Sequence, residues 1–251
     1  MKALITGASS GLGWEYAILL DSIGYDIIAV ARREDKLLEL KNMLKNNTEI
    51  LVADLSREEE CIKLTENYPD IDILINNAGF GVFGEFSLTD SEKELSMIDV
   101  NIRAMHILFK SYLKLFLNKD KGYILNVSSS AAFFPGPLFS AYYASKAYIY
   151  RLTRGVIHEL KKSKSKVQVS VFLPGPILTE FNEKAGVNPG KGAITPQYAA
   201  EISIKKMFKK KHIIVPGFAT KFTRIFSKLL PECITEKIVY HLQKAKKCDS
   251  K

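Results

Sequence analysis

The segment from Ser140 to Tyr150, SAYYASKAYIY, places four tyrosines and one lysine within eleven residues. If this segment is helical, Tyr142 and Lys146 stand at positions i and i+4 and share one face of the helix. An ammonium group close to a phenol favours the phenolate and should lower the tyrosine pKa from about 10 towards neutrality. A phenol of that kind can protonate a carbonyl oxygen or accept the proton of an alcohol.

Two other interpretations of this segment stay open when the residues are taken alone. The pair could simply face the solvent, as many i,i+4 pairs on helix surfaces do. Tyr143 lies three residues before Lys146 and could reach the same lysine. Periodicity therefore does not decide between Tyr142 and Tyr143.

A glycine-rich segment, TGASSGLG, extends from Thr6 to Gly13. It follows the apolar run KALIT and opens a predicted helix that begins near Gly11. Glycines in such a turn let the backbone approach a pyrophosphate, and free N–H groups at the helix start bind its charge. The context predicts a dinucleotide site, although a plain turn between a strand and a helix could have the same composition.

The glycine spacing, G-x-x-x-G-x-G, resembles that of the short-chain dehydrogenase/reductase family. Further motifs of that family follow in order: Asp54 in VADLS, NNAG at Asn76–Gly79, Asn101 in DVNIRA, Ser129 in NVSSS, Tyr142 and Lys146 in YYASK, and Pro174–Gly175 in LPGP. The match covers roughly residues 2–217. Because chance agreement of so many ordered motifs is negligible, the chain is identified as a member of this family from its sequence.

The resemblance implies four catalytic residues, Ser129, Tyr142, Lys146 and Asn101. The family pattern Y-x-A-S-K fits YYASK only when it is counted from Tyr142, and the thirteen-residue step from Ser129 to Tyr142 also matches. By the same resemblance, Ser129 donates a hydrogen bond to the substrate oxygen. Lys146 is also expected to bind the nicotinamide ribose, and Asn101 to hold a water in a proton relay.

Some of these assignments have alternatives in the residues themselves. Ser128 and Ser130 flank Ser129, and a run of serines after a strand is often only a polar turn. An asparagine within a helix more commonly bonds its own backbone. Tyr148 and Tyr150 are predicted to be packing residues.

The resemblance further implies a site for a nicotinamide dinucleotide. Its expected residues are Gly7, Ser9, Ser10, Gly11, Leu12, Gly13, Arg32, Arg33, Asp54, Leu55, Asn77, Ala78, Gly79, Tyr142, Lys146, Pro174, Gly175, Ile177 and Thr179.

The end of the second predicted strand bears on the choice of cofactor. Relatives that use NAD place an acid there to bind the ribose 2′-hydroxyl. In this chain the position is Ala31, followed by Arg32 and Arg33. Guanidinium groups bind phosphate in a bidentate fork, and at the start of a helix their charge would otherwise be unfavourable. We therefore predict NADP(H) rather than NAD(H).

Short apolar runs alternate along the chain with longer helical patterns, which gives seven predicted strands. The interior runs are nearly continuous Val, Ile and Leu, as is typical of parallel strands buried on both faces. The alternation predicts an α/β fold with a doubly wound, seven-stranded parallel sheet, which the resemblance makes Rossmann-like. We expect a single cofactor-binding and catalytic domain over residues 1–217, with residues 178–195 as a mobile cap over the carboxyl ends of the strands.

The remaining residues, 218–251, are predicted to form a basic, amphipathic helical tail. Residues 205–251 contain 13 lysines and arginines against three acidic residues, so the chain's net charge of +9 is concentrated there. In helical projection one arc is apolar and the opposite side basic: Phe218, Phe222, Ile225, Phe226, Leu229 and Leu230 against Lys221, Arg224 and Lys228. Such a helix could lie on an anionic membrane. The preferred hypothesis is that it covers the protein's own substrate entrance or a subunit interface.

Composition narrows the remaining possibilities. The three cysteines are widely spaced and the four histidines scattered, so neither a disulfide nor a metal site is predicted. No apolar run approaches the roughly 20 residues of a spanning helix, and no secretory signal opens the chain, which favours a cytoplasmic protein. No nucleic-acid partner is expected, whereas the family resemblance implies a homo-oligomer, either a dimer or a tetramer.

The sequence thus predicts an NADP(H)-dependent oxidoreductase that interconverts a ketone or aldehyde with an alcohol. Mostly apolar residues of the cap and loops indicate a hydrophobic substrate: Phe80, Phe83, Phe133, Phe134, Leu138, Phe181 and Val187. One alternative is a reductase of acyl groups on an acidic carrier protein that docks on the basic tail. Another is a non-catalytic dinucleotide-binding sensor, against which the complete set of Ser129, Tyr142 and Lys146 argues.

Overall fold

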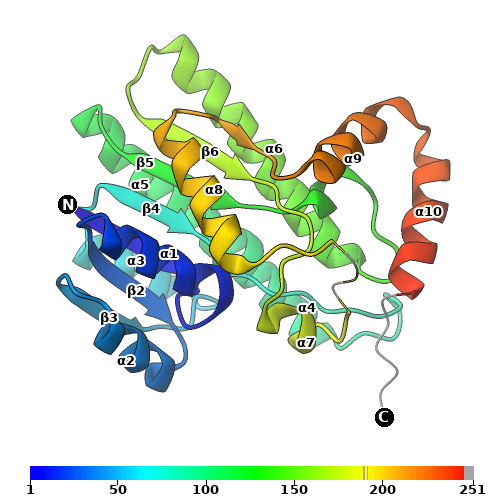
Figure 1. Cartoon of the computed structure of the whole chain (residues 1–251), viewed down its shortest axis with the longest axis horizontal. Helices are drawn as coiled ribbons and strands as arrows, with labels where there is room; N and C mark the ends of the chain where they lie inside the picture. Colours follow the sequence, from blue (N-terminus) through cyan, green and yellow to red (C-terminus); the bar gives the residue numbers. More distant parts are fainter. Residues whose placement is uncertain (189, 191, 246–251) are drawn as a thin grey trace.

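The structure, a computed structural model, describes residues 1–188, 190 and 192–245. Its centre is a seven-stranded sheet in the order β3-β2-β1-β4-β5-β6-β7, and every neighbouring pair is parallel. The strands are β1 (Lys2–Thr6), β2 (Asp26–Ala31), β3 (Thr48–Val52), β4 (Ile73–Asn76), β5 (Tyr123–Val127), β6 (Gln168–Phe172) and β7 (Ile213–Ile214). This order confirms the predicted doubly wound parallel sheet (Figure 1).

Helices cover both faces of the sheet (Figure 1). Successive strand side chains point to opposite faces, so Ala3 and Ile5 pack on one side and Leu4 on the other. The first face packs against α1 (Gly11–Ser22), α2 (Glu34–Met43) and α8 (Pro196–Phe208). The second face packs against α3 (Glu58–Asn67), α5 (Met105–Lys119) and α6 (Ser140–Lys162). Burial on both faces explains why the strands are continuous apolar runs.

The helical region after β4 is interrupted in its register. α4 (Ser91–Ile98) runs into a π-helical turn, η1 (Asp99–Ala104), which continues as α5. The wider turn contains Asn101 and turns its side chain into the protein interior, where it is fully buried. π-Turns within α-helices frequently occur at functional sites.

The region of the predicted cap, residues 178–195, contains one short helix, α7 (Glu180–Lys184). Its two ends are joined by a parallel bridge between Ile177 and Ile194. Residues 189 and 191 of this region lie outside the described part of the chain.

Two helices follow the last strand, as the sequence predicts: α9 (Phe218–Leu229) and α10 (Glu232–Lys244). Pro231 separates them, and α10 turns back along the side of the molecule (Figure 1). The side chains of Phe218 and Lys228, which belong to the predicted arcs, are outside the described residues, as are residues 246–251. Within the described chain, no helix has the length and apolar character needed to cross a bilayer.

Candidate active site

A cleft opens at the carboxyl ends of the strands, where ligands bind in open α/β sheets. Segments that follow β1 to β6 form its walls, and the cap and α10 close one side. All of the predicted cofactor and catalytic residues lie on this wall except Gly13 and Asn101. The structure therefore brings together residues from the whole length of the chain.

The glycine loop after β1 has a backbone conformation and close packing that require glycine at several positions. Gly7 and Gly11 have φ values of +69° and +55°, a left-handed conformation that favours glycine. Gly13 lies beneath the loop rather than on the cleft wall. A Cβ at this position would stand 2.2 Å from the carbonyl oxygen of Gly7, so only glycine fits there. The loop thus presents its backbone to the cleft, and a Cβ at any of these three glycines would press on neighbouring protein atoms.

The loop is joined to the segment after β4 by hydrogen bonds. The Thr6 hydroxyl oxygen accepts from the backbone N–H groups of Asn77 and Ala78, both at 3.0 Å. In return, Asn77 Nδ2 donates to the carbonyl oxygen of Thr6 at 3.0 Å. Thr6 is therefore a positioning residue, and it is not among the site residues predicted from the sequence. Its only signal was its place at the junction of strand and glycine loop.

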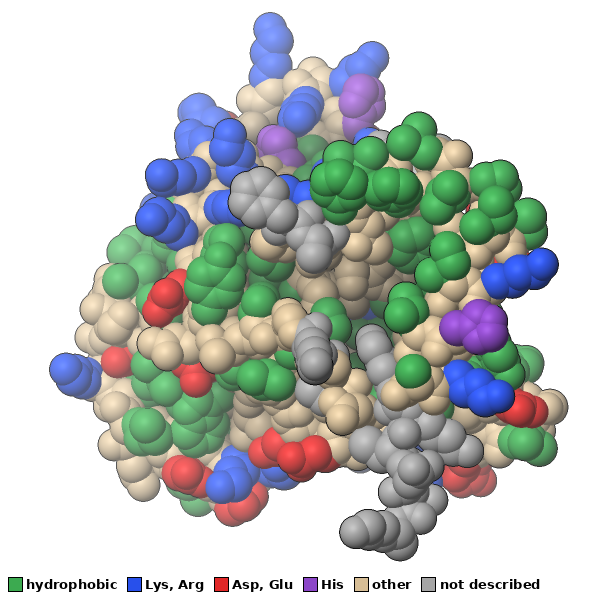
Figure 2. Space-filling view, turned by 45° about the vertical axis from the view of Figure 1, so that its right-hand side comes forward, with side chains coloured by type: hydrophobic (Ala, Val, Ile, Leu, Met, Phe, Trp, Pro, Cys, Tyr) green, Lys and Arg blue, Asp and Glu red, His purple; other side chains and the backbone are tan. Residues whose placement is uncertain are grey.

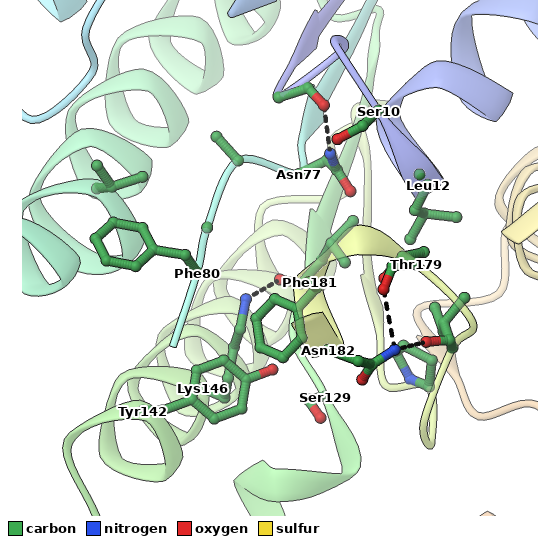
Figure 3. Close-up of a pocket in the computed structure, with 18 of the residues that line it drawn as sticks. Ser10, Leu12, Asn77, Phe80, Ser129, Tyr142, Lys146, Thr179, Phe181 and Asn182 are labelled. Carbon is green, nitrogen blue, oxygen red and sulfur yellow. Dashed lines mark hydrogen bonds between the residues drawn. The ribbon is translucent and has the colours of Figure 1, made fainter. Parts of the chain in front are cut away.

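Helix α6 and the end of β5 assemble the predicted catalytic group (Figure 3). The Ser129 hydroxyl lies beside the Tyr142 phenol, close enough to lower its pKa in part. Lys146 lies behind it: its Nζ is 5.7 Å from the Tyr142 ring centroid and donates to the carbonyl oxygen of Val127 at 3.2 Å. Both α6 side chains are buried, as the shared helix face predicts.

The direction of the Tyr142 pKa differs from the sequence-based expectation. Burial raises the pKa of Tyr142 well above that of a free phenol, and the neighbouring Ser129 hydroxyl lowers it only in part. Burial also lowers the pKa of Lys146 to about 8, because its ammonium loses hydration. The predicted fall of the tyrosine pKa is therefore wrong for this arrangement: burial of the phenol dominates, and the Lys146 ammonium binds the Val127 carbonyl.

Two of the three consecutive serines after β5 have separate roles in the structure. Ser128 is buried, and its hydroxyl donates to the backbone carbonyl of Lys146 at 2.8 Å. Ser129 caps the short 3₁₀ helix η2 (Ser130–Phe133), where its hydroxyl oxygen accepts from the backbone N–H of Ala131 at 3.1 Å. Of the three serines, Ser129 is the one whose hydroxyl lies beside the Tyr142 phenol.

Asn101 is placed behind the cleft wall rather than on it. Its Nδ2 donates to the Phe80 carbonyl at 2.9 Å and to the Ser145 hydroxyl at 3.1 Å, while its Oδ1 accepts from the Phe80 N–H at 3.1 Å. A Cβ built on Gly79 would stand 2.7 Å from Asn101 Oδ1 and 3.4 Å from Lys146 Nζ. The asparagine therefore holds the segment after β4 against α6 beside the lysine, and both of its amide protons are used by protein groups.

Aromatic rings enclose the Tyr142 phenol. The Tyr142 ring stacks on Phe139, with centroids 4.5 Å apart, and Phe181 of the cap lies 5.4 Å away. Among the seven residues predicted to contact substrate, Phe80, Phe181 and Val187 line the cleft.

The other four residues that were predicted to contact substrate do not line the cleft. Phe83 packs against Phe139, and Phe133 packs against Phe134 and Tyr150. Leu138 occupies a turn with φ of +65°. The packing role predicted for Tyr150 is thus confirmed.

The two arginines after β2 line the cleft but differ in their contacts. Arg33 donates to the Ser9 hydroxyl and carbonyl at 3.2 Å and pairs with Glu180 of the cap at 3.0 Å. Arg32 is exposed and forms no hydrogen bond or ion pair with another residue in the described part of the chain. Ala31 offers no carboxylate at the end of β2, and the remaining wall acid, Asp54, bonds Ser56 in its own turn at 2.9 Å.

The last turn of α10 reaches the cleft through Gln243. Its buried amide donates to the phenol oxygen of Tyr143, whose ring packs over Gly136. Asn182 of the cap is a second unassigned wall residue, and its Nδ2 donates to the Ile177 carbonyl at 2.6 Å. Neither had a sequence signal, because each is defined by contacts formed on folding.

We expect Tyr143→Phe to loosen α10, because it leaves the buried Gln243 amide without its acceptor. An unsatisfied buried amide costs about 1–3 kcal/mol, which corresponds to roughly a 5- to 150-fold rise in local opening. Hydrogen exchange of residues 232–245 measures this change. The double variant Tyr143→Phe, Gln243→Leu should recover most of the protection, since both partners are then apolar. Unchanged exchange in the single variant would show that the contact does not hold the helix.

Comparison with known proteins places the chain in a family. The profile described as short chain dehydrogenase matches residues 1–189. A 3-oxoacyl-acyl-carrier-protein reductase of Rickettsia prowazekii is 33% identical over 183 residues, which cover 72% of this chain and 75% of that protein. The chain belongs to the short-chain dehydrogenase/reductase family, and it is an oxidoreductase of that family.

Two solved structures share the fold over nearly the whole chain. A short-chain dehydrogenase from Sphingobium yanoikuyae in complex with NADPH has a TM-score of 0.82 and 27% identity, covering 91% of this chain and 93% of that one. A 7beta-hydroxysteroid dehydrogenase also has a TM-score of 0.82, with 25% identity and coverage of 95% and 96%.

Proposed function

We propose that this protein is an NADP(H)-dependent oxidoreductase that interconverts a hydrophobic ketone or aldehyde with its alcohol, with Tyr142 as the group that transfers the proton. The observation that carries the proposal is the buried Tyr142 phenol, which meets the Ser129 hydroxyl at the end of a cleft that begins at the glycine loop. The pyrophosphate of a dinucleotide fits the backbone cradle of Gly7 and Gly11. A bound nicotinamide would supply or accept the hydride.

The side chains of the chain itself would handle the proton and the developing charge. In reduction, the carbonyl oxygen lies between the Tyr142 phenol and the Ser129 hydroxyl, where both donate hydrogen bonds. Because burial keeps Tyr142 protonated at neutral pH, the phenol is in the form that gives up a proton. The Lys146 ammonium stabilises the phenolate left behind, and Asn101 acts as a positioning residue through Phe80 and Ser145.

A hydrophobic substrate is supported by the rings that surround the phenol. Phe139, Phe181 and Val187 exclude water from the reacting end of the cleft and offer apolar contact area. The steroid dehydrogenase with the same fold is a precedent for a bulky apolar substrate. Aliphatic and cyclic ketones should therefore be preferred over small polar ones.

The proposal is tested by a panel of carbonyl compounds in which consumption of NADPH is followed. The panel includes aliphatic ketones, cyclic ketones and a 3-oxoacyl thioester carried on acyl carrier protein. The thioester is included because of the related acyl-carrier-protein reductase and the basic residues after position 204. If a carrier docks there, salt should slow reduction of the thioester and leave reduction of a free ketone unchanged. Absence of turnover across the panel would favour the non-catalytic sensor.

We expect Arg32→Ala to weaken the use of NADPH selectively. Arg32 is exposed on the cleft wall, where its guanidinium can pair with a 2′-phosphate. Loss of a hydrogen bond to a charged group costs about 1.5–3 kcal/mol, so kcat/KM with NADPH should fall roughly 10- to 150-fold, while kcat/KM with NADH stays nearly constant.

Glu180→Gln is the matched control, since it removes the acid paired with Arg33 and leaves both arginines in place. This variant should retain the preference for NADPH. A wild-type protein that clearly prefers NADH would contradict the assignment.

A further inference from the structure

The two tail helices expose apolar side chains that a self-contained protein would bury. Phe222 and Leu229 of α9 are 61% and 72% exposed. We define the tail apolar face as the exposed apolar residues that repeat at helical spacing on the two helices: Phe222, Ile225, Phe226, Leu229, Ile234, Ile238 and Leu242. The rings of Phe222 and Phe226 stack with centroids 5.4 Å apart, so part of this face is already ordered.

The orientation of α10 is the strongest sign that this face has a partner. The helix buries Thr235, Val239 and Gln243, which repeat every four residues and pack toward the protein. The neighbouring row, Ile234, Ile238 and Leu242, faces outward. A helix that served only its own core would turn its isoleucines and leucine inward. Here two of the three inward positions are polar, and one of them, Gln243, is held by Tyr143.

Basic residues accompany the tail apolar face. Lys221 on α9 and Lys237 and Lys244 on α10 are exposed. Lys206 of α8 lies close enough to Lys221 for that charge to help lower its pKa, after the larger effect of burial. In Figure 2, hydrophobic side chains gather at the upper right of the molecule, where α9 and α10 lie, and lysine and arginine side chains gather along the upper left.

We propose that the tail apolar face docks on the surface of an anionic phospholipid bilayer. Exposed phenylalanine, isoleucine and leucine side chains would enter the headgroup boundary while the lysines contact lipid phosphates. A second copy of this chain fits less well, because a two-fold interface would bring the same basic residues of both copies together. An acidic protein partner would match the positive charge of the tail. Charge pairing alone would not account for the exposed apolar rows of α9 and α10, whereas a bilayer accounts for both.

The test uses the full chain and pelleted vesicles. Vesicles of phosphatidylcholine with phosphatidylglycerol should bind the protein, and vesicles of phosphatidylcholine alone should bind it much less. Binding should weaken as salt is raised from about 50 mM to about 500 mM, since the electrostatic part is screened. This readout does not depend on turnover, so its outcome is independent of the proposed reaction.

Matched variants separate this face from general surface hydrophobicity. Ile225→Glu with Phe226→Glu replaces side chains that are 57% and 45% exposed. The control, Leu38→Glu with Met43→Glu on α2, replaces side chains that are 46% and 57% exposed. The tail variant should lose at least roughly tenfold in vesicle partitioning, and the α2 variant should bind like the wild type. Unchanged thermal unfolding of both variants shows that folding is intact.

Three results would overturn the proposal. The first is vesicle binding without the expected selectivity, either for wild type over the tail variant or for anionic over neutral vesicles. The second is a dimer in sedimentation that only the tail variant dissociates, together with no vesicle binding, which assigns the face to a second copy. The third is binding of acyl carrier protein but not vesicles, abolished in the same variant, which assigns it to a carrier.

Discussion

Replacing Tyr142 by phenylalanine is expected to lower kcat for carbonyl reduction by about a thousandfold, within the range of 10²–10⁴ that a positioned general acid supplies. The variant removes one hydroxyl and retains the ring that stacks on Phe139. Substrate and cofactor contacts along the rest of the cleft stay in place, so KM should change by less than the turnover number. Steady-state kinetics with a ketone from the panel measures both.

Tyr143→Phe provides the control within the same helix. Its phenol also lies on the cleft wall, but it bonds Gln243 and not Ser129. We expect a small change in kcat for this variant, even though α10 becomes looser. Full activity in Tyr142→Phe, or an equal loss in both variants, would show that the proton is transferred by another group.

The second large effect concerns Lys146 and depends on pH. Burial lowers the pKa of Lys146 to about 8, so its ammonium is present below that pH and is lost as the pH rises through it. The pKa of Tyr142 is shifted upward by burial and does not titrate in this range. We therefore expect kcat/KM for reduction to be level below about pH 8 and to fall above it, because the reactive form needs the charged lysine beside the protonated phenol.

Lys146→Met should lower kcat/KM by roughly 10²–10³-fold and remove the fall above pH 8, since no group then titrates there. Lys146→Arg keeps a charge at all accessible pH values, so its kcat/KM should also be level across this pH range. The absolute value of kcat/KM will depend on how well the larger guanidinium fits the site. A fall near pH 8 that persists in both variants would assign the titration to another residue.

Burial of this lysine also has a consequence for folding. Its pKa in the folded protein is below its value in the unfolded chain, so the folded state binds the proton less well. The contribution of Lys146 to stability is therefore present above about pH 10.5 and is lost as the pH falls through about 8. Lys146→Met should remove this part of the pH dependence of unfolding. The unfolding measurement thereby separates the effect of the lysine on stability from its effect on turnover.

The sequence by itself determined the sheet, the glycine loop and the predicted catalytic group. Strand side chains that alternate between two buried faces require continuous apolar runs, and these are visible in a single chain. Gly7 and Gly13 could be recognised because their role is local: one needs a left-handed φ and the other close packing of neighbouring backbone. Helix geometry placed a tyrosine beside Lys146, and the family pattern Y-x-A-S-K and the spacing from Ser129 selected Tyr142 over Tyr143.

Tertiary structure decided what depends on distant contacts and on burial. The partners of Asn101 lie 21 and 44 residues away, so its amide is used by Phe80 and Ser145, a fact that helical periodicity does not contain. The pKa of Tyr142 is raised because burial removes the hydration of the phenolate, while the Lys146 ammonium binds the Val127 carbonyl. Gln243 reaches Tyr143 across 100 residues, and this contact fixes which side of α10 faces the cleft. The sequence showed that the tail is amphipathic, and only the packed structure showed that its apolar rows face outward, because the direction of a helix face is set by what it packs against.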